Sequence, residues 1–203
     1  MNLKDILFPK KQEKRFYYAE KSSAFRMAKT LYEWIPHNRQ ELIIVCIGTD
    51  RSTGDSLGPL VGTLLTEQAK SLHYIKIYGT LDSPVHAKNL TEHVNKIQES
   101  HQNPFIIAID ACLGKQSSIG SIITGIGSMK PGAAVQKHLP DIGDIYISGV
   151  VNMSGYMEYF VLQNTRLSIV MNMAKQIAQS LRYLDHFMIK EVKAEYKETE
   201  ENH

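Results

Sequence analysis

Residues 41–63, ELIIVCIGTDRSTGDSLGPLVGT, decide the fold that the sequence predicts. The stretch begins with an apolar run at 42–47, passes through a polar turn that holds glycines and aspartates, and enters a helix at about Leu57. A continuous apolar run is typical of a strand that is covered on both faces, as in a parallel sheet. In open α/β sheets the loop that follows such a strand is where ligands bind. The turn at 48–56 is therefore the first candidate for a functional site.

The rest of the chain alternates predicted strands with predicted helices. Further strands are expected at 74–78, 105–109, 119–126 and 144–151, and helices at 22–35, 57–71, 86–100 and from about 159 onward. This alternation predicts an α/β fold, a three-layer α/β/α sandwich with a mostly parallel sheet. If the first strand, at 42–47, lies between the second, at 74–78, and the third, at 105–109, the strand order begins 2-1-3. The loops after residues 47 and 109 then open into the same crevice.

Length and composition fit one globular domain over residues 1–203, since a single core serves roughly 100–200 residues. The chain is 43% hydrophobic and has a net charge of +2, which gives no overall attraction to nucleic acid or to a membrane surface. No apolar stretch approaches the roughly 20 residues of a membrane span. Cys46 and Cys112 lie in or beside apolar runs without metal-ligand spacing, which favours buried, reduced thiols and an intracellular protein.

Both ends of the chain are charged. Residues 1–20 are expected to form an irregular leader, and the first thirty residues hold eight Lys or Arg against three acids. This basic segment could dock an acidic partner, and a solvated leader is the alternative. Residues 190–203 are expected to be a frayed, charged tail.

Asp55 and Asp110 are the candidate catalytic residues. Asp55 stands just before the helix predicted at 57–71, where capping that helix is the alternative role. Asp50, nearer the end of the strand, is a rival for the functional role. Asp110 closes the apolar run FIIAI, so its carboxylate must be paired, hydrogen-bonded or raised in pKa.

Two carboxylates brought close together cannot both ionise easily, so one stays protonated while the other acts as a base. The base can activate water and the acid can protonate a leaving amine, which is the chemistry of peptide hydrolysis. The same pair could instead hold a divalent cation that activates water. The residues alone leave both alternatives open.

Other catalytic and nucleotide-binding motifs do not fit the sequence. Gly48 and Gly54 are separated by five residues instead of the four of a phosphate-binding loop, and Asp55 stands where that loop needs a lysine. The pattern G-x-G-x-x-G does not follow the first strand, and Ser56 lacks the surroundings of a G-x-S-x-G nucleophile.

The stretches TGDSLGPLVG at 53–62 and AIDA at 108–111 resemble the two aspartate motifs of the germination protease of endospore-forming bacteria, which degrades small acid-soluble spore proteins. They are also similar to those of the hydrogenase-maturation endopeptidases, which share a phosphorylase/hydrolase-like α/β fold. In length and motif context the chain most resembles the YyaC-type sporulation proteins, regarded as spore proteases. The resemblance covers roughly residues 41–180.

The resemblance implies that Asp55 and Asp110 are the catalytic aspartates. In the maturation endopeptidases two acidic nickel ligands fall on the same two positions, and their third ligand, a histidine, would lie near residues 130–132. This chain has no histidine there, and His138 stands later in the same predicted loop. The departure favours a metal-independent pair, and the metal-dependent alternative would use Asp55, Asp110 and His138.

Loops at 80–83 and 127–143 are expected to line the substrate cleft, with Thr80, Asp82 and Asp50 as substrate-binding residues. The function predicted by the resemblance is a sporulation-associated endopeptidase that acts on a protein or peptide in the cytoplasm of the forespore or mother cell. No cofactor is expected, although a divalent metal is left open. The alternative from another class is a non-catalytic sporulation protein that binds or regulates a partner. Neither nucleic acid nor membrane is an expected partner, and a homo-oligomer is compatible with the sequence.

Overall fold

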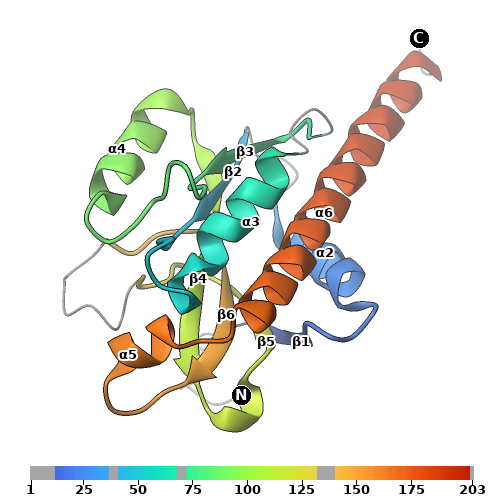
Figure 1. The fold of residues 1–203 in the computed structure, drawn as a ribbon. Coiled ribbons are helices and arrows are strands. Elements are labelled where there is room, and N and C mark those ends of the chain that lie inside the picture. The colour runs from blue at the N-terminus through green and yellow to red at the C-terminus, as the bar shows by residue number, and fades with distance from the viewer. Residues whose placement is uncertain (1–11, 37–40, 68–71, 132–139, 202–203) are drawn as a thin grey trace, which may run out of the picture.

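The computed structural model describes residues 12–36, 41–67, 72–131 and 140–201, with side chains described up to residue 190. A six-stranded sheet with the order β1-β5-β6-β4-β2-β3 runs through the middle of the molecule (Figure 1). The strands are β1 Glu13–Tyr17, β2 Glu41–Cys46, β3 Ile75–Tyr78, β4 Pro104–Gly114, β5 Ser121–Ile126 and β6 Ile145–Met153. The helices are α2 Ser23–Trp34, α3 Leu57–Thr66, α4 Leu90–Ser100, α5 Glu158–Gln163 and α6 Leu167–Glu201, with short 3-10 turns η1 Gly54–Ser56 and η3 Gln116–Ser118.

The sheet is mostly parallel. Strands β3, β2, β4 and β6 run in one direction, whereas β5 is antiparallel to both β6 and β1. Strand β2, the first of the predicted strands, lies between β3 and β4, the second and third. This is the expected 2-1-3 order. The carboxyl ends of β2 and β4 therefore lie at the same edge of the sheet.

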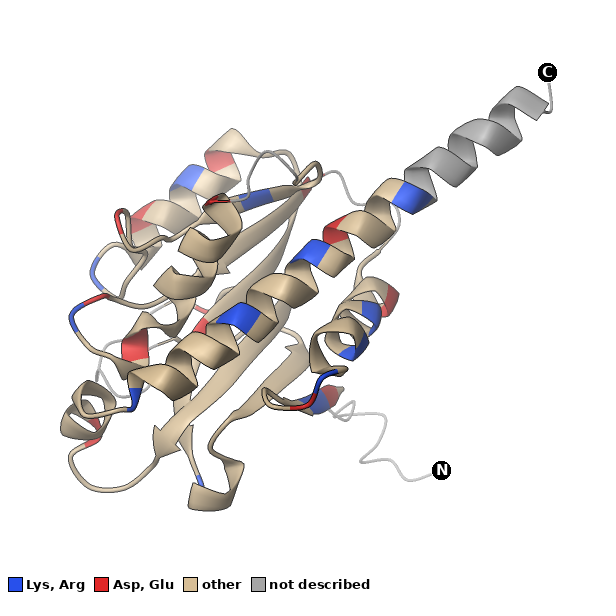
Figure 2. Ribbon diagram, turned by 45° about the vertical axis from the view of Figure 1, so that its right-hand side comes forward, with Lys and Arg blue, Asp and Glu red and all other residues tan. Residues whose placement is uncertain are grey.

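Helices cover both faces of the sheet, so the predicted three-layer α/β/α class is confirmed. Leu42, Ile44 and Cys46 of β2 point into a core shared with α2, α3 and α6. The alternate residues of β2 and Ile47 point into a second core on the side of α4. The strand is buried on both faces, and this explains why its sequence is continuously apolar. Acidic and basic residues are interspersed along the outer helices (Figure 2).

Helix α6 packs on α2 and α3 through the apolar stripe that the sequence predicts. The six stripe residues are all buried: Val170, Met173, Ala174, Ile177, Ala178 and Leu181. The helix extends to Glu201, into the charged segment at 190–203 that was expected to fray. None of the helices in the described ranges is long and apolar enough to cross a membrane.

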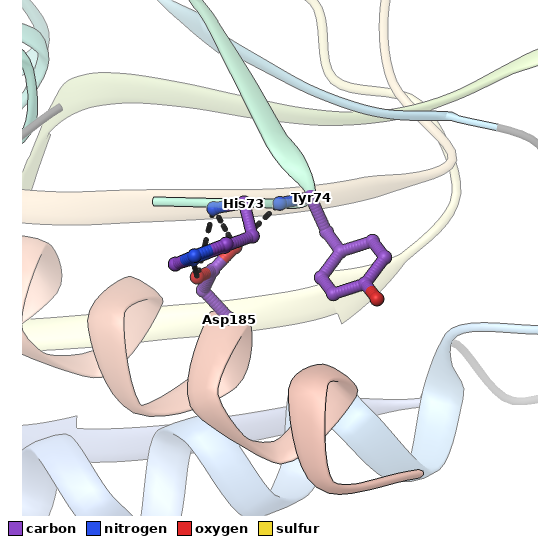
Figure 3. Close-up of polar contacts among 3 residues, drawn as sticks. All are labelled: His73, Tyr74 and Asp185. Atoms are coloured by element: carbon purple, nitrogen blue, oxygen red, sulfur yellow. Dashed lines mark hydrogen bonds and ion pairs between the residues drawn. The ribbon is translucent and has the colours of Figure 1, made fainter. Parts of the chain in front are cut away.

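Asp185 fastens α6 to the segment before β3 (Figure 3). Asp185 is 1% exposed, and its carboxylate accepts the backbone N–H of Tyr74 at 2.8 Å and that of His73 at 3.1 and 3.2 Å. The His73 ring also faces the carboxylate, with its Nδ1 atom 3.9 Å from Oδ2 of Asp185. Hydrogen bonds from two backbone amides offset the cost of burying this charge.

The structure differs from the sequence predictions at several element ends, and α4 begins at Leu90 instead of residue 86. Part of the leader expected to be irregular forms strand β1, in which Phe16 alone is buried. Strand β4 continues to Gly114, so Asp110 lies inside the strand instead of at its end. Helix α3 ends at Thr66 instead of residue 71. His138, with most of the loop expected at 127–143 that precedes residue 140, lies outside the described residues.

Candidate functional site

The loop after β2 leaves the sheet at Gly48 and folds back on itself. Gly48 has φ +147°, and its N–H donates to the carbonyl of Val85 at 2.8 Å instead of to a neighbouring strand. The next N–H, of Thr49, donates to the carbonyl of Asp55 at 3.1 Å. A Cβ on Gly48 would lie 1.9 Å from that same Asp55 carbonyl, so this close approach requires glycine. The backbone of Asp55 is therefore held against the end of β2.

Asp55 lies in the short turn η1 that leads into α3. Its side chain is partly buried, and burial raises the pKa of its carboxyl group above the usual value. The buried Ser52 hydroxyl lies beside the carboxylate and partly offsets this pKa shift, without forming a hydrogen bond of normal geometry. The protonated form of Asp55 thus persists to a higher pH than that of an exposed aspartate.

Asp110 is 8% exposed and pairs with Ser148 of β6. One residue earlier, the carbonyl of Ile109 accepts the N–H of Ile47 at 2.7 Å. Alternate residues of a strand direct their backbone polar groups to the same neighbour, so the N–H of Ala111 points to where β2 would continue. Because β2 has already left the sheet, the Oδ1 atom of Asp110 accepts this N–H instead, at 2.8 Å. The Asp110 carboxylate therefore lies on the side of β4 that β2 has vacated.

Asp55 and Asp110 belong to segments that meet at this edge. Residues of η1 lie within 8 Å of residues of β4, measured between Cα atoms. Leu57 packs directly on β6, where a Cβ on Gly149 would lie 2.3 Å from its Cδ2 atom. Gly149 is paired with Ala111, the residue after Asp110. The start of α3 thus lies over the strands next to Asp110.

The expected substrate-binding residues occupy the same edge but differ in their surroundings. Thr80 follows β3 and uses its hydroxyl to accept the N–H of Ser83 at 3.1 Å, which closes a tight turn. Asp82 is exposed in that turn. Asp50 is exposed in the loop after β2, with one carboxylate oxygen 3.4 Å from the Thr49 hydroxyl. Their role in binding a substrate stays a prediction.

A metal site would need a third ligand beside the two aspartates. Within the described ranges, no group of three or more His, Cys, Asp or Glu side chains is arranged to hold an ion. His138, the third ligand expected for the metal-dependent alternative, is outside those ranges. The described residues do not make up the implied ligand set, so no catalytic step is assigned to a metal.

Two features of the site were missed in the sequence. Ser52 stands three residues before Asp55 in the polar turn and was not singled out, although a small hydroxyl residue in the same turn as a candidate acid is a usable signal. Helix α5 packs on η1: a Cβ on Gly54 would lie 2.7 Å from the Cδ2 atom of Leu162. The hydrophobic turn at 159–162 is visible in the sequence, but its contact with the Asp55 segment is not.

Two comparisons of the sequence with known proteins find relatives of this chain. The family described as "Protein of unknown function (DUF1256)" matches residues 15–180. The curated "Uncharacterized protein YyaC" of Bacillus subtilis (strain 168) is 48% identical over 190 residues, which cover 91% of each chain. This similarity agrees with the expected likeness to YyaC-type proteins.

One solved structure is similar in fold. The crystal structure of a [NiFe] hydrogenase maturation protease, HycI from Thermococcus kodakarensis KOD1, matches with a TM-score of 0.51 and 16% sequence identity. The match covers 77% of this chain and 99% of the other. At this level of identity the likeness concerns the fold, and it bears out the expected similarity to the maturation-endopeptidase fold.

Proposed function

The chain belongs to the DUF1256 family, and from that premise we propose that it is an endopeptidase in which Asp55 and Asp110 share the acid and base roles. The observation that carries the proposal is the position of the Asp110 carboxylate. It is turned toward the gap left by β2, at the edge where the Asp55 segment approaches β4. The protease-like fold shared with HycI supports a protein substrate.

The surroundings of the two aspartates suggest which takes each role. Burial raises the pKa of Asp55, which favours its protonated form and suits it to the role of acid. Asp110 is then the base that takes a proton from water as the water oxygen attacks the peptide carbonyl. The proton on Asp55 passes to the leaving amine as the peptide C–N bond breaks. One water is consumed, and the products are a new carboxyl terminus and a new amino terminus.

The finer form of the proposal concerns the substrate. The motif resemblance to the germination protease favours small acid-soluble spore proteins, cleaved in the cytoplasm of the forespore or mother cell. This assignment rests on TGDSLGPLVG at 53–62 and AIDA at 108–111.

The test is to incubate the purified protein with small acid-soluble spore proteins and to follow their fragments by mass spectrometry. Asp55→Asn and Asp110→Asn are each expected to lower the cleavage rate at least about 100-fold, the lower range for losing a general acid or base. Glu99→Gln, an exposed change on α4, is the matched control and should cleave at the wild-type rate. Cleavage that survives both aspartate changes would remove the proposed mechanism.

The same assay separates the alternatives. Activity that is lost with a chelator and recovered with nickel, zinc or manganese would favour the metal-dependent alternative with His138. Folded protein that cleaves none of the substrates would favour the non-catalytic binding protein.

A further inference from the structure

Helix α5 and its flanks carry most of the exposed apolar side chains. Ten large hydrophobic side chains are exposed among the described residues, and six of them fall between residues 153 and 167. The side chains at the centre of this surface, which we call the α5 patch, are Tyr156, Met157, Tyr159 and Phe160. Tyr156 is 99% exposed, and the rings of Tyr159 and Phe160 meet edge to face with their centroids 6.0 Å apart. Grouped exposed aromatics and methionine are typical of surfaces that bind other polypeptides.

The opposite side of α5 is firmly held. Leu162 is 6% exposed and packs on Gly54 of η1. The side-chain amide of Asn152 donates to the carbonyl of Val161 at 3.3 Å and contacts the Thr165 hydroxyl at 3.2 Å. The Thr165 hydroxyl donates to the same Val161 carbonyl at 2.8 Å. The patch therefore stands on an anchored helix, which presents its side chains in a fixed arrangement.

Met157, the residue before α5, is in the left-handed region with φ +62°. This conformation is unfavourable for a residue with a bulky side chain, and most such positions are taken by Gly or Asn. The carbonyl of Met157 accepts the N–H of Phe160 at 2.8 Å and that of Val161 at 3.2 Å, so the strained residue starts the helix. A large exposed side chain at a strained position is a feature that functional sites retain.

The helix that carries the α5 patch packs on η1, the turn that holds Asp55. Gly54, which α5 covers, is the residue directly before Asp55. A polypeptide that lies along this edge would pass the exposed side of α5. A second copy of the chain seated on the patch would crowd the same edge, so its position favours a substrate over a dimer partner.

We propose that the α5 patch binds a large apolar side chain of an unfolded polypeptide substrate beside the bond to be cut, and that it thereby sets the specificity of the enzyme. This inference rests on the proposed endopeptidase function. The patch residues do not touch the reacting atoms and act by holding the substrate chain in place.

The experiment measures binding separately from cleavage. The probe is fluorescently labelled, reduced and carboxymethylated α-lactalbumin, a permanently unfolded protein, and its binding to full-length Asp110→Asn protein is followed by fluorescence anisotropy. The test variant adds Tyr156→Ser, Tyr159→Ser and Phe160→Ser. The control variant adds Tyr74→Ser and Ile126→Ser instead, which remove exposed apolar side chains at the other edge of the sheet. Circular dichroism checks that both variants fold.

We expect the patch variant to bind the probe about tenfold more weakly and the control to bind as before, since truncating three interface aromatics costs at least about 1.4 kcal/mol. In the active background the patch change should raise KM and leave kcat within twofold. Equal binding by both variants would overturn the proposal, even if the wild-type protein cleaves its substrates. Loss of binding in the patch variant alone, with no cleavage by any form, would support the patch and reject the endopeptidase. If sedimentation velocity shows a wild-type dimer and a monomeric patch variant, and probe binding is unchanged, the patch binds a second copy of the chain and the proposal is overturned.

Discussion

Asp185 and Asp110 are both almost buried, yet they lie in different surroundings. Asp185 is on α6 between two layers of the fold, and its carboxylate accepts backbone N–H groups from His73 and Tyr74 (Figure 3). Asp110 is on the interior strand β4, just past the point where β2 ends, and its Oδ1 atom accepts the N–H of the next residue of its own strand. The first contact joins segments 111 and 112 residues apart, whereas the hydrogen bond from Ala111 to Asp110 is local.

The difference separates a structural carboxylate from a candidate catalytic one. Asp185 connects a helix to the start of β3, so its removal should cost stability. The Asp110 carboxylate accepts the backbone N–H of Ala111, which β2 does not reach. The side-chain amide oxygen of an asparagine could accept the same N–H. Substitutions that keep the shape of the side chain and remove its charge should therefore act on different properties at the two positions.

The largest effect is expected for Asp110→Asn. The amide oxygen can still accept the Ala111 N–H, so the free energy of unfolding should change by less than about 1 kcal/mol. Peptide cleavage should fall at least about 100-fold because the amide cannot act as a base. Urea unfolding and the cleavage assay, measured on the same preparation, check the two halves of this prediction. If the unfolding free energy falls by clearly more than this while cleavage is lost, Asp110 is a structural residue like Asp185.

Gly48→Ala should be the next largest change, because it moves the Asp55 backbone. The new Cβ would lie 1.9 Å from the Asp55 carbonyl and 2.9 Å from the Pro59 ring, and the left-handed φ adds strain. We expect a loss of about 3–4 kcal/mol in unfolding free energy, the combined cost of strain and overpacking. Gly127→Ala is the control, since φ there is +110° and nothing lies within 4 Å of the added Cβ. Equal losses at the two glycines would mean that strain acts alone and that the loop is not held against Asp55.

Asp185→Ala should lower the unfolding free energy by about 2–3 kcal/mol, the usual cost of leaving buried groups without their charged partner. Asp185→Asn keeps one acceptor oxygen and should lose about half as much. Both variants should retain the wild-type cleavage rate per folded molecule, measured well below the midpoint of urea unfolding. Loss of cleavage in a fully folded Asp185 variant would contradict the division between the two carboxylates.

The central strands could be predicted from the sequence because each is buried on both faces, so β2 and the first half of β4 read as continuous apolar runs. Strand β1 could not, because an edge strand that buries only Phe16 resembles a charged loop. The extension of β4 beyond Ile109 depends on β6, which continues to pair with it up to Met153. Neighbouring strands set strand ends, and a single stretch of sequence does not contain that information.

The candidate site could also be predicted only in part from the sequence. The strand order 2-1-3 follows from general rules for α/β sheets and is enough to bring the Asp55 and Asp110 segments to one edge. The hydrogen bond from Ala111 to Asp110 could not be predicted, because it exists only where β2 ends before β4 does. Asp185 was not singled out at all, since its partners lie more than a hundred residues earlier in the chain.

The smallest expected effect is the change in unfolding free energy caused by Asp55→Asn, and its sign at pH 7 is opposite to that expected for Asp185→Asn. Burial raises the pKa of Asp55 in the folded state, so at neutral pH the folded protein carries an ionised group that it stabilises less well than the unfolded chain does. The stabilising contribution of Asp55 is fully present below the unfolded pKa, near 4, and is lost as the pH rises through the folded value. Asp55→Asn should therefore slightly increase the unfolding free energy at pH 7 relative to wild type, and this gain should disappear at pH 3. Asp185→Asn, which removes a charge that accepts backbone hydrogen bonds, should lower the unfolding free energy at pH 7. Urea titrations of the three proteins at both pH values measure these differences, and a destabilised Asp55→Asn at pH 7 would mean that Asp55, like Asp185, is retained for the fold.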